Sequence, residues 1–261
     1  MHVLAEPFWL HKVGNAPEEY EDAVWPEQLI QREEKLFRFA VADGATETSF
    51  SGVWANILVR AYGQGQLKAR NLPKSLPRLQ KEWLTSVSLR AQPLPWYAEE
   101  KLRDGAFSSI LGFTIGPATA DSGQSGRWKA IAIGDSCLFH VRDGHLLTAF
   151  PLENAQQFNN RPVLVSSHPT GNRRVAADIA HISGAWQVHD MFYLMTDALA
   201  CWFLRRQEED DSAILCLSDI ATQARFAQFV QEERQQCDAL GRPCLRNDDV
   251  TMLRVTLLEV E

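Results

Sequence analysis

The sequence has no long hydrophobic run, few cysteines and no block of basic residues, and each absence excludes a class of protein. No stretch approaches the roughly 20 apolar residues that a membrane-spanning helix needs. The five cysteines are an odd number and show no C-x-x-C spacing, which argues against a zinc knuckle and a disulfide framework. The net charge is -7, so binding to nucleic acid, which needs a clustered basic surface, is disfavoured. No basic segment precedes an apolar core at the N-terminus, so we expect a cytoplasmic protein without a secretory signal.

Two common catalytic arrangements are also missing. The seven histidines show no H-x-x-x-H or comparable metal-binding spacing, and we expect each of them to lie on the surface or in a loop. No serine stands in a Gly-x-Ser-x-Gly elbow, so a serine hydrolase has no support. The eight tryptophans occupy predicted core positions and are expected to pack there. Carboxylates are the remaining candidates for chemistry.

Hydrophobic periodicity predicts strands and helices in separate groups. Strands are predicted over residues 37–42, 109–115, 128–133, 137–141, 145–149, 161–166, 191–196 and 251–260. Helices are predicted over residues 49–68, 76–87, 96–103, 199–206 and 218–236, the last with Ser218 as its cap. Asp143-Gly144 suits a tight antiparallel hairpin, because both residues tolerate positive φ angles. The grouping is not a regular βαβ alternation, so we expect an α+β sandwich, with a loop-rich region over 153–184 that could contact substrate.

Four aspartates stand at the ends of predicted strands or in turns: Asp43, Asp135, Asp197 and Asp248. Glu21-Asp22 adds an acidic pair near the N-terminus. A single aspartate in such a place is usually a turn former or a helix cap. Gathered at one edge of a sheet, however, these carboxylates would offer hard oxygen ligands, which suit Mg²⁺ or Mn²⁺. Two such ions could activate water and stabilise the charge on a transferring phosphoryl group.

The segments around these residues occur in a characteristic order. They are Glu21-Asp22-Ala23, Phe39 to Gly44, Ala130 to Ser136 with the Arg142-Asp143-Gly144 turn, Tyr193 to Asp197, and Asp248 to Thr251. In this order and setting the chain resembles the PPM-type (type 2C) metal-dependent serine/threonine protein phosphatases. The resemblance implies one domain over residues 1–261. It also implies a four-layer α-β-β-α sandwich, with two mainly antiparallel sheets flanked by helices.

The resemblance also implies the chemistry. Its metal-binding set is Asp43, Gly44 through its carbonyl, Asp197, Asp248, Glu21 through a bound water, and Asp135. Its active-site set is Asp43, Asp197, Asp248, Glu21 and Asp22, the last of which would orient its neighbours. Asp135 would bind a third, weaker ion, or would simply be a turn residue. The implied reaction is hydrolysis of phosphoserine or phosphothreonine in a protein by a hydroxide that bridges two Mg²⁺ or Mn²⁺ ions, without a phospho-enzyme.

Several residues depart from the family pattern. No histidine follows Gly44 to act as a general acid, and Pro17 stands where an arginine usually grips phosphate, with Lys12 as a candidate substitute. Cys201 replaces an acid of the third metal site, and Asp249 replaces the usual asparagine. Two alternatives therefore stay open. One is a pseudo-phosphatase that serves as a binding or regulatory module, and the other is a phosphatase of small phosphorylated metabolites.

Overall fold

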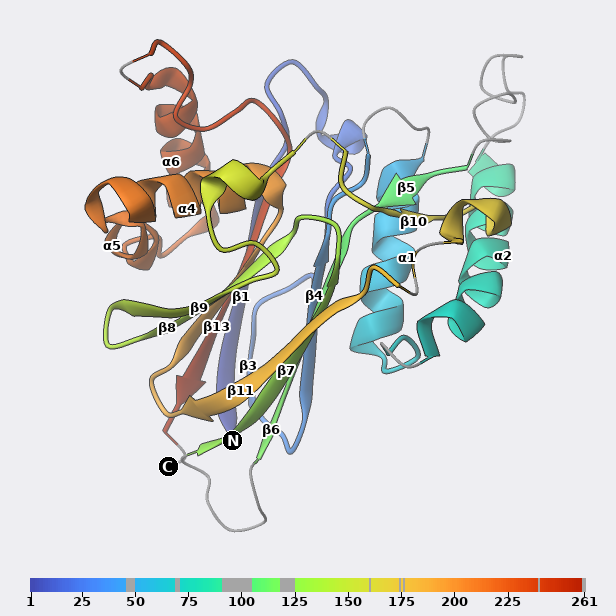
Figure 1. The fold of residues 1–261 in the computed structure, drawn as a ribbon, viewed down its shortest axis with the longest axis horizontal. Coiled ribbons are helices and arrows are strands. Elements are labelled where there is room, and N and C mark those ends of the chain that lie inside the picture. The colour runs from blue at the N-terminus through green and yellow to red at the C-terminus, as the bar shows by residue number, and fades with distance from the viewer. Residues whose placement is uncertain are drawn as a thin grey trace.

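Two antiparallel β-sheets pack face to face, with helices on both outer sides (Figure 1). The structure is a computed structural model that describes residues 1–45, 50–68, 71–90, 105–117, 125–159, 161–173, 175, 177–238 and 240–259. In these ranges the first sheet has the order β3-β1-β13-β12-β8-β9, the second has the order β11-β7-β6-β4-β2, and β10 pairs with β5 in a two-stranded sheet. The expected α+β sandwich with flanking helices is therefore confirmed.

The bounds of the elements follow the chain. The strands are β1 (His2–Leu10), β2 (Ala23–Trp25), β3 (Ile30–Glu33), β4 (Phe37–Ala42), β5 (Phe107–Ser108), β6 (Ile110–Pro117), β7 (Ser125–Ile133), β8 (Cys137–Arg142), β9 (His145–Phe150), β10 (Val165–Ser166), β11 (Ala180–Gln187), β12 (Met191–Met195) and β13 (Val250–Leu258). The α-helices are α1 (Ser51–Gly63), α2 (Leu72–Arg90), α4 (Asp197–Asp210), α5 (Ala213–Ser218) and α6 (Gln223–Gln235). Short 3₁₀ helices are η1 (Pro17–Glu19), η3 (Ala155–Gln157) and η4 (Pro169–Asn172). No helix of the described ranges is long and apolar enough to cross a membrane.

Strand β7 shows why the layers form, because its two faces contribute to two different cores. Trp128 and Ala130 belong to the core between the sheets, whereas Ile131 and Ile133 pack in the core beneath α1 and α2. A third core lies between the first sheet and α4, α5 and α6. Buried residues on alternate sides of a strand need a covering layer on each side, and the helices provide the outer layers.

Most predicted elements in the described ranges are confirmed, with some shifts at their ends. The helix expected over 49–68 is α1, the helix expected over 76–87 lies within α2, and β8 pairs with β9 as predicted. The hairpin turn has positive φ at both of its central residues, 51° at Asp143 and 76° at Gly144. The predicted helix over 96–103 lies outside the described residues.

Four predictions were wrong. Ser218 ends α5 rather than starting a long helix, and α6 begins after Thr222, whose side chain accepts a hydrogen bond from the Arg225 N–H. The strand expected over 161–166 is only β10, and β11 occupies part of the region expected to be loop. His140 was expected at the surface, but it is 3% exposed within β8. The residues around His140 in the sequence do not reveal its buried partner, Asp190, whose hydrogen bond satisfies the buried imidazole.

Candidate metal centre

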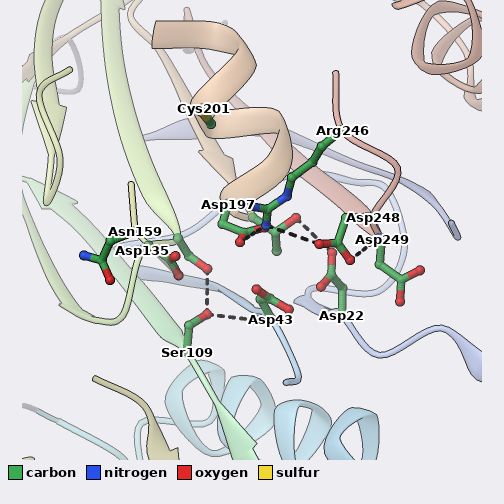
Figure 2. Close-up of polar contacts among 12 residues, drawn as sticks. Asp22, Asp43, Ser109, Asp135, Asn159, Asp197, Cys201, Arg246, Asp248 and Asp249 are labelled. Atoms are coloured by element: carbon green, nitrogen blue, oxygen red, sulfur yellow. Dashed lines mark hydrogen bonds and ion pairs between the residues drawn. The ribbon is translucent and has the colours of Figure 1, made fainter. Parts of the chain in front are cut away.

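Strands of both sheets end together at one end of the sandwich and bring four aspartates to the same place. Asp43 follows β4 and Asp135 follows β7 in the second sheet. In the first sheet Asp197 follows β12 as the first residue of α4, and Asp248 precedes β13. One carboxylate oxygen from each of Asp43, Asp135 and Asp197 lies within 4.8 Å of the other two. Figure 2 shows their side chains converging on this point.

Two serines, Ser109 and Ser136, link the end of β4 to the end of β7. The Asp43 N–H donates to Ser109 Oγ at 2.9 Å, and the Ser109 N–H donates to the Asp43 carbonyl at 2.8 Å. Ser109 Oγ is 2.7 Å from Ser136 Oγ, next to Asp135. These contacts bridge 66 residues of sequence between Asp43 and Ser109. The backbone of Asp43 is therefore held by Ser109, and its side chain remains free to face the centre.

Gly44 is required by a close backbone approach. A Cβ atom at this position would lie 2.6 Å from the Glu21 carbonyl oxygen, a distance that no packed atom tolerates. The glycine therefore lets the acidic pair at the N-terminal side come against the end of β4. This contact is the structural reason for an Asp-Gly sequence here.

Asp22 is a buried carboxylate with one satisfied oxygen. Its Oδ2 accepts hydrogen bonds from Thr196 Oγ1 at 2.8 Å and Thr251 Oγ1 at 2.7 Å, and Tyr20 in turn contacts the Thr251 hydroxyl. Its Oδ1 has no hydrogen-bond partner among the described residues, and the same holds for Asp135 Oδ1. Buried carboxylate oxygens without donors are costly unless a cation approaches them. The side chains present therefore fit a bound cation.

The electrostatics of the cluster point the same way. Burial, and then the charges of Asp197, Asp22, Asp135 and Asp248, raise the pKa of Asp43 well above its usual value. Burial and the charge of Asp197 raise the pKa of Asp135 to about 7. Burial also raises the pKa of Asp22 and of Asp197. Because the donors are all oxygens, a hard divalent ion such as Mg²⁺ or Mn²⁺ matches them better than a thiolate-preferring metal.

Arg246 enters the cluster and was missed by the sequence reasoning. Its guanidinium contacts Asp197 Oδ2 and lies 3.2 Å from Asp248 Oδ2. Figure 2 shows the side chain reaching across both aspartates. The only available signal was its position two residues before Asp248, because arginine near a carboxylate pair often forms ion pairs.

The carboxylates of Glu21 and Asp249 are engaged by nearby groups of the protein. Glu21 Oε1 accepts a hydrogen bond from Ser51, and Oε2 is 3.6 Å from Lys12 Nζ. Asp249 is 4% exposed and accepts from two backbone groups, the Lys12 N–H at 2.8 Å and the Glu21 N–H at 2.7 Å. Asp249 thus clamps the segment that contains Glu21 and turns away from the cluster (Figure 2).

A cleft with a volume of about 900 Å³ opens beside Glu21. It lies between the segment of residues 12–21 and the helices α1 and α2. Lys12 and Arg60 line it together with Glu18, Glu21 and Glu82. The lining of this cleft is therefore polar and carries both signs of charge.

The structure brings some of the predicted site residues together and leaves others outside the cluster. Asp43, Asp135 and Asp197 meet directly, and Asp248 joins them through the shared contact with Arg246. Asp22 lies beside the cluster, whereas the carboxylate of Glu21 is engaged by Ser51 and Lys12. Cys201, one turn along α4 from Asp197, points away from the carboxylates (Figure 2).

Comparisons with known proteins agree with the resemblance seen in the sequence. The sequence matches the family described as Protein phosphatase 2C over residues 20–244. No curated protein matches this chain. Among solved structures, the serine/threonine phosphatase PstP/Ppp of Mycobacterium tuberculosis superposes with a TM-score of 0.57 at 14% identity, covering 99% of this chain and 100% of that one.

Two further structures are similar. The catalytic domain of the phosphatase PstP in complex with two manganese ions has a TM-score of 0.55 at 14% identity, covering 99% of both chains. PppA of Pseudomonas aeruginosa, described as a regulatory component of the type VI secretion system, has a TM-score of 0.54 at 16% identity, covering 98% of both chains. At such low identity these matches establish the fold alone.

Proposed function

Because the chain belongs to the Protein phosphatase 2C family, we propose that it hydrolyses phosphoserine and phosphothreonine in proteins with two Mg²⁺ or Mn²⁺ ions at the candidate metal centre. The observation that supports this proposal most directly is the meeting of the Asp43, Asp135 and Asp197 oxygens within 4.8 Å at a buried end of the sandwich. The single domain over residues 1–261 and the cytoplasmic location remain predictions, and a role in signalling is part of this proposal.

Each acidic residue has a proposed role. Asp43, Asp197 and Asp248 would hold the two ions with the Gly44 carbonyl, and Glu21 would act through a bound water. Asp135 would serve a third, weaker site, and one of its carboxylate oxygens lies within 4.8 Å of those of Asp43 and Asp197. Divalent ions held by such carboxylates supply an activated water and neutralise phosphate charge.

The residues of this chain contribute orientation and substrate binding. Asp22 is a positioning residue, because its Oδ2 accepts from Thr196 and Thr251 while its Oδ1 faces no donor among the described residues. Lys12, at the edge of the 900 Å³ cleft, is proposed to bind a phosphate oxygen in place of the arginine replaced by Pro17. The cleft would hold the peptide around the phosphorylated residue.

A pseudo-phosphatase is the second candidate. The specific observation in its favour is Arg246, whose positive charge pairs with two of the expected metal ligands. In this case the fold would bind a partner or a phosphorylated peptide without turnover. A phosphatase of small phosphorylated metabolites is the third candidate, and the cleft beside Glu21 is large enough for either kind of substrate.

The deciding experiment measures phosphate release from a phosphothreonine peptide and from p-nitrophenyl phosphate, with and without Mn²⁺. We expect Mn²⁺-dependent release that falls by about a thousandfold in Asp43→Asn, which corresponds to about 4 kcal/mol of transition-state stabilisation. Asp43→Asn should fold normally, because a carboxylate at a strand end contributes little packing.

Asp143→Asn is the matched control, because Asp143 lies in the exposed β8–β9 turn and asparagine tolerates its φ of 51°. This variant should keep full activity. Unchanged turnover in Asp43→Asn would overturn the metal-centre assignment. Binding of Mn²⁺ without hydrolysis of either substrate would favour the pseudo-phosphatase, and hydrolysis of p-nitrophenyl phosphate alone would favour a small phosphorylated substrate.

A further inference from the structure

Arg246 places a permanent positive charge beside two of the carboxylates that would bind metal. Its guanidinium contacts Asp197 Oδ2 and is 3.2 Å from Asp248 Oδ2. The pair of contacts joins an aspartate at the end of β12 to one at the start of β13. Figure 2 shows the side chain directed at both carboxylates.

The backbone around Arg246 is anchored, so this placement is built into the fold. The preceding residue, Leu245, is 1% exposed in the core beneath α4 and α6. Its N–H donates to the Glu233 carbonyl of α6 at 3.1 Å, and the Asp248 N–H donates to the Arg246 carbonyl at 3.0 Å. The Arg246 side chain itself is 46% exposed. It therefore has a fixed base and an open path toward solvent.

An arginine and a divalent ion need the same feature of these carboxylates. Both are attracted to the negative charge of Asp197 and Asp248, and the oxygen that accepts an N–H from Arg246 has that lone pair occupied. Two cations close together in a partly buried site also repel each other. An ion that uses the same lone pairs must therefore take the place of the guanidinium.

We propose that Arg246 is a built-in cation that occupies the Asp197–Asp248 side of the metal centre and competes with one of the two divalent ions. The inference rests on the proposed function, since it assumes that the cluster binds metal. An ion held by Asp197 and Asp248 would require the guanidinium to move toward solvent, and it would therefore bind more weakly than an ion held without these two residues. Arg246 thereby sets the metal concentration at which the centre is fully loaded.

The test is a calorimetric titration of the metal-free protein with Mn²⁺, in the wild type and in three variants. For Arg246→Gln we expect the dissociation constant of the weaker ion to fall by roughly tenfold or more, because a competing unit charge at close range is removed. Arg246→Lys keeps the charge and should stay within about threefold of the wild type, since its ammonium still reaches a carboxylate but makes fewer contacts. Arg242→Gln is the matched control, because Arg242 lies in the same connection and pairs with Asp238 outside the site.

Thermal unfolding separates competition from a merely structural role. Arg246→Gln should lower the Tm of the metal-free protein, where the carboxylates lose their counter-charge, yet increase the rise in Tm caused by saturating Mn²⁺. A structural role would lower the Tm in both states and weaken Mn²⁺ binding. Circular dichroism checks that each variant is folded before the titration.

The possible outcomes separate the competition by Arg246 from the proposed metal-dependent function. If the wild type binds Mn²⁺ and releases phosphate but Arg246→Gln binds Mn²⁺ equally or more weakly, the competition is overturned and the proposed function stands. If Arg246→Gln binds an ion that the wild type does not, the competition is supported in its strongest form. If neither protein binds Mn²⁺, both the competition and the metal-dependent function are wrong.

Discussion

Strand β12 carries a buried aspartate beyond each of its ends, and the two have opposite electrostatic environments. Asp190, just before the strand, is fully buried, and its carbonyl accepts a hydrogen bond from the Leu257 N–H near the C-terminus. It accepts from Arg142 Nε at 2.6 Å and Nη2 at 2.8 Å, from the Gln187 N–H at 2.8 Å, and pairs with His140 Nε2 at 2.8 Å. Although burial raises its pKa, the hydrogen bonds from Arg142 and His140 outweigh that effect and lower the pKa to about 2.

Asp197, beyond the other end of β12, has the Arg246 guanidinium as a donor but otherwise lies among carboxylates. Burial raises its pKa, the charge of Arg246 lowers it, and the charge of Asp248 raises it, with a net increase. Asp43 and Asp135 beside it also have raised pKa values. Burial alone therefore does not distinguish the two ends, whereas the supply of donors does. A carboxylate surrounded by donors is a structural anchor, and a group of carboxylates short of donors is a site for a cation.

Among the variants that test this comparison of Asp190 with Asp197, Asp190→Asn is expected to have the largest effect. The change leaves the Arg142 guanidinium without its buried counter-charge, which typically costs about 3–5 kcal/mol. We expect the free energy of unfolding, measured in urea, to fall by about this amount, while the folded fraction keeps the proposed Mn²⁺-dependent activity. A loss below about 1 kcal/mol would mean that the Asp190 network adds little to stability.

The pH dependence of the metal-free protein should come mainly from the other end of β12. The pKa of Asp135 is raised from 3.8 to about 7, so the folded state retains a proton that the unfolded state loses. This stabilising contribution is complete below pH 3.8 and is lost as the pH rises through about 7. We expect the free energy of unfolding in EDTA to fall by about 2–3 kcal/mol between pH 5 and pH 8.

Two controls sharpen this pH experiment. Saturating Mn²⁺ should abolish the decline, because the metal stabilises the ionised carboxylates at high pH. The decline should persist in Asp190→Asn, because the pKa of Asp190 is about 2 and it does not titrate in this range. A metal-free protein whose stability stays constant from pH 5 to pH 8 would contradict the raised pKa of Asp135.

A smaller effect is expected at Asp249, next to the proposed ligand Asp248. Asp249 uses one oxygen for the Lys12 N–H and the other for the Glu21 N–H, and asparagine has only one acceptor oxygen. Asp249→Asn should therefore cost about 1–2 kcal/mol of unfolding free energy. Its Mn²⁺ affinity should change little, whereas Asp248→Asn should weaken Mn²⁺ binding and leave stability unchanged. Equal effects of the two variants on Mn²⁺ binding would contradict the different roles of Asp248 and Asp249.

Some elements were readable from sequence because their local pattern and their environment agree. The apolar run of β12 predicted a strand, and Asp143-Gly144 predicted the hairpin turn. The edge strand β11, by contrast, alternates exposed residues with half-buried ones, includes Gly184 and buries only Trp186, so it carries little hydrophobic signal. Strand β1 was missed because Glu6 interrupts its apolar pattern, and the compensating partner, Arg254, lies opposite it on β13.

The sequence by itself determined which residue types stand at the strand ends, and the order of the acidic segments was sufficient to predict the family. Only the tertiary structure decided which of them meet. Asp43 and Asp197 are separated by most of the chain, and their proximity depends on two sheets packing with their strand ends aligned. The pairing of Arg246 with Asp197 and the burial of His140 against Asp190 arise in the same way, because a charge finds its partner across the fold and not along the chain.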